Sequence, residues 1–362
     1  MAASKRVRIA DVAGRAGVGV GTVSRVLNGS PHVREATRQR VLAAIDQTSY
    51  RPSRLAAGLS RGTPASVAII VPFLTRPSVV ARLAGVIEVL DAEGYDTIVC
   101  NVETPAQRDR QVRMLAEGHR AAGAVVISLR LSAAQLAELA TAGVRVVLID
   151  VPARGVPHTV VDDVLGGMMA TAHLIGLGHR RIGFIGDAGG GGLGFSSTSD
   201  RLRGYRRALA QAGLPAEPKL ARRVRPESAA AANMALRLFR LPEPPTAIFA
   251  ASDIQAMGVL SAADAAGLPV PQRLSVIGFD DIDMAAPLGL STVRQPLRNS
   301  GARGAARLAT LLRGMTVSPL REVLPLEVVA RRTTAAPQLR GTGANGARRR
   351  GLKTPTPLAR VT

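Results

Sequence analysis

Two short helical patterns lie within residues 9–40 and are separated by the tripeptide Gly-Val-Gly. The first pattern repeats apolar residues three and four positions apart, which places them on one face of a helix. These residues are Ile9, Val12, Ala13 and Ala16. Gly17 follows as the helix stop. Two helices of about two turns each, joined by a glycine turn, are typical of a helix-turn-helix.

The second pattern covers residues 20–27 and has an apolar and a polar face. Its apolar residues are Val23, Val26 and Leu27, and its polar residues are Thr22, Ser24 and Arg25. In a helix-turn-helix the second helix lies in the major groove of DNA. Short hydroxyl side chains suit phosphates and base edges, while the planar fork of arginine fits the two acceptors of guanine. The polar face therefore predicts contact with DNA.

A third helical pattern, over residues 34–49, follows Pro31 and is expected to bury Val41, Leu42 and Ile45 against the first two. A plain three-helix bundle with a solvated basic face is the alternative interpretation. The charge favours DNA, because residues 1–62 hold eleven Lys or Arg and only three Asp or Glu. Such a positive module is the electrostatic footprint expected of phosphate binding.

Four short motifs occur in order along this part of the chain. They are Ile-Ala-Asp-Val-Ala at 9–13, Ala-Gly-Val at 16–18, Thr-Val-Ser-Arg-Val-Leu-Asn at 22–28 and Tyr-Arg-Pro at 50–52. With these motifs the N-terminus closely resembles the LacI/GalR family of bacterial transcription regulators, and the resemblance continues over residues 8–333. It implies a DNA-binding headpiece over residues 1–62, an effector-binding and dimerisation core over 63–333 and a tail over 334–362.

The resemblance also implies which residues contact DNA. In the family, the first two positions of the recognition helix and an arginine three residues after its threonine select the operator. These positions are Val20, Gly21 and Arg25 here. Further phosphate or base contacts would come from Thr22, Ser24, Asn28 and His32. Because Val20 offers only an apolar contact and Gly21 none, we expect Arg25 to carry most of the direct base readout.

Residues 53–60 form a single short helical pattern that is too brief to be stable alone. The family uses this segment as a hinge helix that folds on DNA, where a leucine from each subunit enters the minor groove. Leu59 matches that leucine, and Arg54 and Ala56 would make further DNA contacts. Unstacking the base step costs about a few kcal/mol, which the contacts of bent DNA offset. A plain linker is the alternative.

Beyond residue 66, apolar runs alternate with helical patterns such as 82–92 and 106–120. The runs are residues 67–71, 95–100, 123–127, 144–149, 181–185, 247–250 and 275–279. This alternation indicates parallel sheets covered by helices on both faces. The resemblance implies a periplasmic-binding-protein-like core of two such α/β subdomains, with a ligand cleft between them and connections that cross near 151–159, 279–293 and 320–325.

Ligands of open parallel sheets bind beyond the carboxyl ends of the strands. Together with the family resemblance, this rule gives the candidates Phe73, Arg76, Asp163, Arg201, Asp253 and Asp280. By resemblance, Arg201 matches an arginine that binds ligand hydroxyls or carboxylates. For each carboxylate the alternative is a cap on the helix that follows. The expected effector is a sugar or another polar metabolite, although six Phe, three Tyr and no Trp offer few stacking surfaces for a sugar.

Several other functions lack support in the sequence. The glycines of residues 189–194 satisfy a dinucleotide-binding spacing only by composition, and a flexible flap near the cleft is the preferred interpretation. Five His and one Cys form neither a metal set nor a nucleophile constellation, so we expect no cofactor, no metal and no enzyme activity. No apolar run reaches the roughly 18 residues of a membrane span, and no signal peptide precedes Lys5. With its single cysteine, the chain is expected in the bacterial cytoplasm.

From Arg331 onward the chain has eight basic and no acidic residues, and it is expected to be disordered. This tail adds either nonspecific DNA attraction or solubility, and the sequence does not decide between them. The hypothesis for the whole chain is a homodimeric or tetrameric regulator, most simply a repressor, that binds a near-palindromic operator. A ligand sensor that does not regulate DNA and an α/β enzyme are the alternatives. Whether the effector releases or promotes DNA binding is left open.

Overall fold

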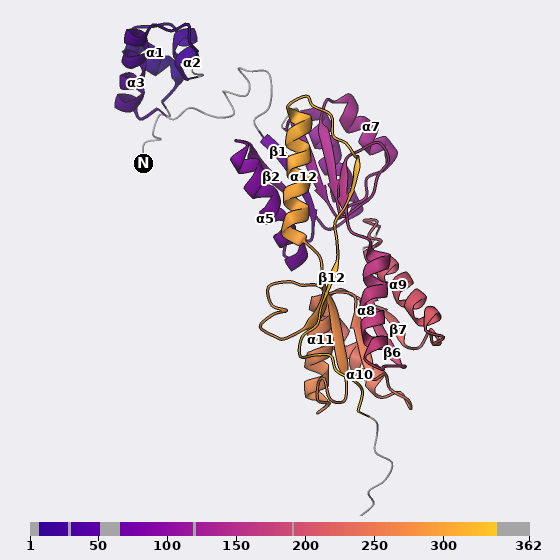
Figure 1. Cartoon of the computed structure of the whole chain (residues 1–362). Coiled ribbons are helices and arrows are strands. Elements are labelled where there is room, and N and C mark those ends of the chain that lie inside the picture. Colours follow the sequence, from indigo (N-terminus) through magenta and orange to yellow (C-terminus); the bar gives the residue numbers. More distant parts are fainter. Residues whose placement is uncertain (1–6, 28–29, 51–65, 119–120, 190–191, 339–362) are drawn as a thin grey trace, which may run out of the picture.

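The computed structural model describes residues 7–27, 30–50, 66–118, 121–189 and 192–338. Its first unit consists of three helices, α1 (Ile9–Ala16), α2 (Val20–Leu27) and α3 (Glu35–Thr48) (Figure 1). Gly17 ends α1 in the left-handed conformation at φ 62°, which glycine adopts without steric penalty. The backbone N–H of Val18 donates to the carbonyl of Ala13 at 3.1 Å, so the turn into α2 is closed by hydrogen bonds.

The core of this unit is formed by one apolar face of each helix. Val12, Val23 and Val41 are fully buried at its centre. The prediction for α3 is wrong at Leu42, which is 42% exposed, whereas Ala44 is buried. Helical spacing gives the reason, because Ala44 lies three positions after Val41 and shares its face, while Leu42 is turned by about 100°.

The second unit contains a six-stranded sheet in the order β11-β5-β4-β3-β1-β2, in which all neighbouring strands are parallel. Its strands are β1 (Ser66–Pro72), β2 (Asp96–Val102), β3 (Gly123–Ile127), β4 (Arg145–Ile149), β5 (His158–Val160) and β11 (Arg321–Val323). One face packs on α5 (Pro77–Ala92) and α12 (Leu297–Leu312), and the other on α6 (Pro105–Gly118) and α7 (Ala133–Thr141). We call this unit the N-terminal subdomain.

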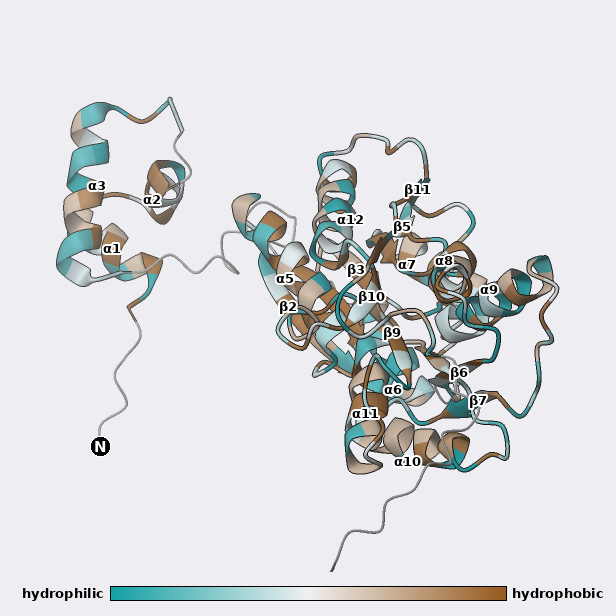
Figure 2. Cartoon of the chain, turned by 60° about the horizontal axis from the view of Figure 1, so that its bottom comes forward, coloured by the Kyte–Doolittle hydropathy of each residue, from teal (hydrophilic) through white to brown (hydrophobic). Residues whose placement is uncertain are grey.

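The C-terminal subdomain repeats this design with the strand order β12-β10-β9-β8-β6-β7, in which only β12 is antiparallel. Its strands are β6 (Ile182–Asp187), β7 (Ala221–Val224), β8 (Ala247–Ala250), β9 (Ser275–Asp280), β10 (Ser291–Arg294) and β12 (Glu327–Val329). Its helices are α8 (Asp163–Gly176) and α9 (Ser197–Gln211) on one face and α10 (Ser228–Phe239) and α11 (Asp253–Ala265) on the other. The buried strands β8 and β9 are mostly apolar, whereas β7 carries two exposed arginines, and helices such as α9 carry both apolar and hydrophilic residues (Figure 2).

Three connections cross between the subdomains, and their positions correct the sequence predictions. The first lies between β5 and α8 at residues 161–162, the second between β10 and α12 at 295–296, and the third between β11 and β12 at 324–326. The crossings predicted at residues 151–159 and 279–293 therefore lie a few residues before the crossings in the structure. Each of them contains or adjoins a short strand, β5 or β10, that the sequence pattern did not reveal. Only the third range overlaps its crossing.

The segment over residues 331–338 is not the beginning of a disordered tail, as the sequence suggested. Thr333 is buried, and its backbone carbonyl accepts a hydrogen bond from the N–H of Val276 at 2.8 Å. His179 contacts the carbonyl of Ala335 at 3.0 Å through Nε2. This segment, which we call the C-terminal strap, is part of the C-terminal subdomain. Within the described residues, no helix is long and apolar enough to cross a membrane.

Candidate functional site

The outer face of α2 carries the residues that the sequence placed in contact with DNA. Val20 is 45% exposed, and Gly21 and Arg25 are exposed as well. The hydroxyl residues Thr22 and Ser24 are half-buried. The exposed part of α2 thus combines one guanidinium group with an apolar side chain and a glycine. This arrangement leaves Arg25 as the long polar side chain available to a base edge.

Four other predicted DNA contacts, Asn28, Arg54, Ala56 and Leu59, lie outside the described residues. His32 is described and exposed, and its backbone N–H donates to Ser30 Oγ at 3.4 Å. The carbonyl of Ser30 in turn accepts a hydrogen bond from Arg38 of α3 at 2.7 Å. The turn that presents His32 is therefore held to the third helix.

A cavity of about 590 Å³ lies between the two subdomains. Its walls come from the carboxyl ends of parallel strands in both sheets, as the rule for open α/β sheets predicts. Four of the six predicted effector residues line it: Phe73, Arg76, Arg201 and Asp280. The first two follow β1 of the N-terminal subdomain, and the last two belong to the C-terminal subdomain.

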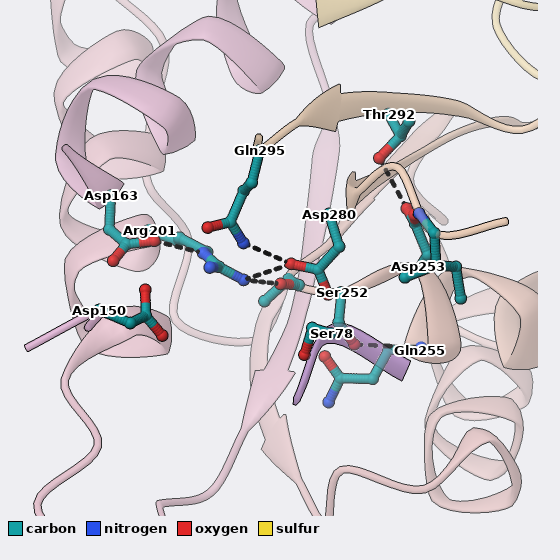
Figure 3. A network of polar contacts seen from close by, with 12 residues as sticks. Ser78, Asp150, Asp163, Arg201, Ser252, Asp253, Gln255, Asp280, Thr292 and Gln295 are labelled. Carbon is teal, nitrogen blue, oxygen red and sulfur yellow. Dashed lines mark hydrogen bonds and ion pairs between the residues drawn. The ribbon is translucent and has the colours of Figure 1, made fainter. Parts of the chain in front are cut away.

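Arg201 lies in the wall of the cavity and is held from three sides (Figure 3). Its Nε donates to Asp163 Oδ1 at 2.7 Å, and its Nη1 donates to the carbonyl of Ala251 at 2.6 Å. Nη1 also lies 3.8 Å from Asp280 Oδ1, and the guanidinium carbon lies 3.7 Å from the centre of the Phe279 ring. Because its position is fixed by these groups, the guanidinium meets a ligand without reorganisation.

Asp163 does not line the cavity but acts on it through Arg201. Burial raises the pKa of Asp163 to about 6, although the neighbouring guanidinium of Arg201 favours the charged carboxylate. The alternative that Asp163 caps α8 does not hold, because Asp162 is the N-cap and accepts from the N–H of Leu165 at 2.9 Å. Asp163 is therefore a positioning residue for Arg201.

Asp253 is not a cavity residue, which corrects its placement in the sequence analysis. It is fully buried, and its oxygens accept hydrogen bonds from the Thr292 hydroxyl at 2.6 Å and the N–H of Ile282 at 2.9 Å. A carboxylate after a strand can point toward the ligand or into the sheet, and here it points into the sheet. Burial, with a smaller effect of the Asp280 carboxylate, raises the pKa of Asp253 to about 7. Ser252 caps α11 instead.

Sequence reasoning missed a chain of polar contacts that joins the subdomains beside the cavity. Arg82 of α5 is buried and bridges Asp150 Oδ1 and Gln295 Oε1, each at 3.0 Å. Gln295 Nε2 donates to Asp280 Oδ1 at 2.6 Å. A signal for Arg82 does exist, because it shares a helix face with Val79 and Val86. An arginine on an apolar face needs a buried partner. Gln295 lies in a connection, where no periodic pattern marks it.

Arg76 presents a second guanidinium to the cavity. Its guanidinium carbon lies 4.2 Å from the centre of the Phe73 ring and 5.7 Å from that of Phe195. Asp187 Oδ2 lies 4.0 Å away, too far for a hydrogen bond. Burial lowers the pKa of Arg76, although Asp187 opposes this shift. The ring face of Phe73 that a ligand could stack on is therefore shared with the guanidinium of Arg76.

Hydroxyl groups complete the walls of the cavity. They come from the starts of α5 and α9 and from the loops after β1, β3 and β8. They belong to Thr75, Ser78, Ser128, Ser196, Ser197, Thr198, Ser199 and Ser252. Hydroxyl, carboxylate and guanidinium groups together supply both donors and acceptors, which suits a ligand rich in hydroxyl or amide groups. In the described part of the chain, no group of three His, Cys, Asp or Glu residues could hold a metal ion.

Comparison with known proteins agrees with this two-part organisation. Residues 8–53 match the family described as bacterial regulatory proteins, lacI family, and residues 171–334 match a periplasmic binding protein-like domain. The HTH-type transcriptional regulator DegA of Bacillus subtilis is 31% identical over 91% of this chain and 98% of its own length. The HTH-type transcriptional regulator CelR of Thermobifida fusca is 33% identical over 90% of this chain and 98% of its own length.

Among solved structures, a lac repressor dimer bound to operator and the anti-inducer ONPF is similar at a TM-score of 0.81 and 26% identity. The match covers 92% of this chain and all of that one. A complex of the transcriptional regulator CelR with cellobiose, 31% identical, matches 91% of this chain at a TM-score of 0.67 and is itself covered in full. With its helix-turn-helix unit, its two parallel-sheet subdomains and these relatives, this chain belongs to the LacI family of DNA-binding transcription regulators.

Proposed function

We propose that this protein is a ligand-responsive repressor of the bacterial cytoplasm. It binds a near-palindromic operator through α2, as a homodimer or a tetramer built from dimers. A small polar molecule, such as a sugar, acts as effector in the cavity. The observation that carries the DNA part is the exposed face of α2, with Val20, Gly21 and Arg25 turned to solvent in a closed helix-turn-helix.

The dimer follows from the symmetry of such sites. Two recognition helices related by a twofold axis read two half-sites of opposite orientation, so the operator repeats the symmetry of the protein. The lac repressor structure to which this chain is similar is a dimer bound to operator, which supports the same arrangement here. Leu59, if it forms part of a hinge helix, would add a contact at the centre of the operator.

Effector control follows from the position of the cavity. Its lining combines Arg76 of the N-terminal subdomain with Arg201 and Asp280 of the C-terminal subdomain. A ligand that contacts both sides favours one angle between the subdomains, and it changes DNA affinity only through that preference. A coupling free energy of about 1–3 kcal/mol is typical of such linkage. The CelR complex with cellobiose shows a sugar bound to a related protein, which supports a sugar or similar polyol.

The first test is selection of bound duplexes from random DNA with the full-length protein. The expected product is a near-palindromic consensus. Arg25→Ala should then relax the preference at one base pair of each half-site and weaken binding to the selected site by about ten- to hundredfold. Arg207→Ala removes the same charge from an exposed position on α9 and serves as the control. Equal operator affinity of Arg25→Ala and the parent would show that another residue reads the DNA.

Salt dependence tests the phosphate contacts separately. A dimer that neutralises about six to ten phosphates should lose roughly a thousandfold or more in affinity between 50 and 200 mM salt. The dependence of DNA affinity on salt concentration is measured with the selected operator and with a duplex of scrambled sequence. A flat response would contradict the DNA-binding role. Failure to select any sequence, combined with binding of a metabolite, would favour a ligand sensor instead.

The effector is identified by thermal unfolding in the presence of a panel of sugars and related polar metabolites. A true effector should raise the temperature at which half of the parent protein is unfolded, and it should also change the affinity of the protein for the operator. Asp280→Asn removes an acceptor at the cavity wall and should abolish the thermal shift, whereas Asp264→Asn on the exposed side of α11 should preserve it. A ligand that stabilises both variants equally binds outside this cavity.

A further inference from the structure

The connection between β6 and α9 contains a residue that is packed into the other subdomain. The connection leaves the C-terminal sheet at Asp187 and is described at residues 188–189 and 192–196. Leu193 within it is fully buried. The buried apolar cluster to which it belongs is otherwise made of residues of the N-terminal subdomain, such as Val112 and Leu115 of α6 and Leu129. The backbone N–H of Arg130 donates to the carbonyl of Leu193 at 3.4 Å.

The two glycines beside Leu193 allow this close approach. Gly192 has φ 87° and Gly194 has φ 83°, which is a region that side chains other than glycine rarely adopt. A Cβ atom at residue 194 would lie 2.7 Å from Arg130 Cβ, and one at residue 192 would lie 3.1 Å from Pro105 Cγ. This part of the glycine-rich stretch therefore presents a leucine across the cleft, a role that its composition did not reveal.

Phe195 extends the same contact into the cavity. Its ring centre lies 6.2 Å from that of Phe73 and 5.7 Å from the guanidinium carbon of Arg76, both in the N-terminal subdomain. The next residues, from Ser196 to Ser199, line the cavity at the start of α9. Because the chain is continuous from Leu193 to these hydroxyl groups, the anchoring of Leu193 fixes where they stand.

This contact lies on the side of the cleft opposite the three crossing connections. The crossings involve β5 and β11 at one edge of the N-terminal sheet and β10 and β12 at the corresponding edge of the other sheet. Leu193 follows β6, which is next to the far edge of its own sheet. The segment meets Arg130, which follows β3, and Gly192 lies beside Pro105, which follows β2 at the far edge of the N-terminal sheet. A contact placed opposite a hinge resists opening with the greatest leverage.

We propose that Leu193 is a latch that holds the two subdomains together on this side of the cleft and that positions Phe195 and the hydroxyls of α9 in the cavity wall. Opening of the cleft withdraws Leu193 from the apolar cluster of the N-terminal subdomain and exposes its side chain to water. The effect of the latch on DNA affinity rests on the proposed function, whereas the latch itself does not.

The test measures the distance between the subdomains in the full-length, ligand-free protein. Spin labels are attached at Glu138→Cys on α7 and Arg207→Cys on α9, both exposed positions, in a Cys100→Ser background. Distances are obtained by pulsed electron resonance. Hydrogen exchange of the Arg130 amide, which donates to Leu193, is followed in parallel. The variants are Leu193→Ala and Gly194→Ala, and the control is Leu139→Ala, a fully buried leucine of the same cluster that lies within one subdomain.

Leu193→Ala should increase the open population by about ten- to hundredfold, because burial of a leucine favours the closed form by that factor. The distribution of distances between the two spin labels then gains a second, longer distance, and the Arg130 amide exchanges faster. Gly194→Ala should act in the same direction through its clash with Arg130. Leu139→Ala should lower the unfolding temperature without adding the longer distance. Unchanged distances in both latch variants, or the same change in Leu139→Ala, would overturn the proposal. Neither result depends on DNA binding.

Discussion

The two carboxylates Asp253 and Asp280 are close in structure but differ in what they can do. Asp280 lines the cavity and accepts from Gln295 at 2.6 Å, whereas Asp253 is enclosed by the Thr292 hydroxyl and the N–H of Ile282. A Cβ atom at residue 278 would lie 2.2 Å from Asp253 Oδ1, so glycine at this position leaves the space for the carboxyl group. Only Asp280 is available to a ligand.

The pKa of Asp253 leads to a prediction about stability and pH. Burial raises this pKa to about 7, above the value of about 4 that an aspartate has in the unfolded chain. Between about pH 4 and pH 7 the folded chain keeps a proton that the unfolded chain has lost. The contribution of Asp253 to the free energy of unfolding is therefore largest at low pH and decreases as pH rises through this window.

Asp253→Asn should remove this dependence, because an amide can donate to the Thr292 hydroxyl and accept from Ile282 without carrying a charge. The free energy of unfolding of the variant, relative to that of the parent, should increase by about 2–3 kcal/mol from pH 5 to pH 8. Urea unfolding at the two pH values measures the difference, with Asp264→Asn on the exposed side of α11 as the control. A variant that loses stability relative to the parent as pH rises would contradict this assignment.

The sequence could identify residues that follow strands, but not the direction in which they point. Phe73, Arg76 and Asp280 line the cavity, as their positions after strands suggested, while Asp253 points into the sheet. Arg201 of α9 also lines it, and only the family resemblance singled it out. Arg82 contacts Gln295, which lies 213 residues away in the chain. Such a pair is created by the crossing between β10 and α12, and no local pattern contains it.

At the scale of single elements, α2 combines good packing with weak helix propensity. Gly21 lies inside the helix, is exposed, and has open space where a Cβ atom would stand. A glycine within a helix is less favourable than alanine by about 0.5–1 kcal/mol, because it loses more backbone freedom on folding. Gly17 differs, since it ends α1 with φ 62°, where an alanine is strained.

Gly21→Ala should therefore slow hydrogen exchange of the α2 amides by about two- to fivefold in the full-length protein. Gly17→Ala should speed exchange in α1 and α2 by about fivefold or more, because a left-handed conformation costs an alanine about 1 kcal/mol or more. Exchange is measured on peptides that cover residues 9–27. A shift in the same direction for both variants would contradict the roles given to these glycines.

The elements that the sequence predicted well are those with a long apolar pattern. The ranges 123–127 and 247–250 coincide with β3 and β8, whose residues are all buried. Helix α5 begins at Pro77, five residues before the predicted start, because proline fits the first position of a helix. Strands β5, β11 and β12 have three residues each, and their existence depends on a neighbour far along the chain. Periodicity cannot reveal them.

For the whole molecule, the connection between the subdomains has two sides with different chemistry. On one side, three chain crossings and the polar contacts of Arg82, Gln295 and Asp280 join the sheets covalently and by hydrogen bonds. On the other, Leu193 makes an apolar contact and accepts one hydrogen bond, from the N–H of the exposed Arg130, which water can replace when the contact separates. A ligand in the cavity therefore lies between a side that acts as a hinge and a side that can separate. This arrangement lets the angle between the two subdomains change.

The C-terminal strap, residues 331–338, completes the C-terminal subdomain and gives a last prediction. The Thr333 hydroxyl donates to the carbonyl of Val276 and accepts from the N–H of Ser291, each at 2.8 Å. Ser275 Oγ donates to the carbonyl of Ala335 at 3.0 Å. Without the strap these groups would lack their partners in a buried part of the sheet, and each unpaired group costs about 1–3 kcal/mol.

A chain that stops after Ala330 should therefore unfold on the order of 10 °C lower than the full-length protein. A chain that stops after Gln338 loses six basic residues but keeps the strap, and its unfolding temperature should stay within about 2 °C of the parent. Calorimetry at a fixed salt concentration compares the three proteins. Equal unfolding temperatures for both truncations would mean that the strap does not stabilise the sheet, and the hydrogen bonds of Thr333 would then be replaced by water at no net cost.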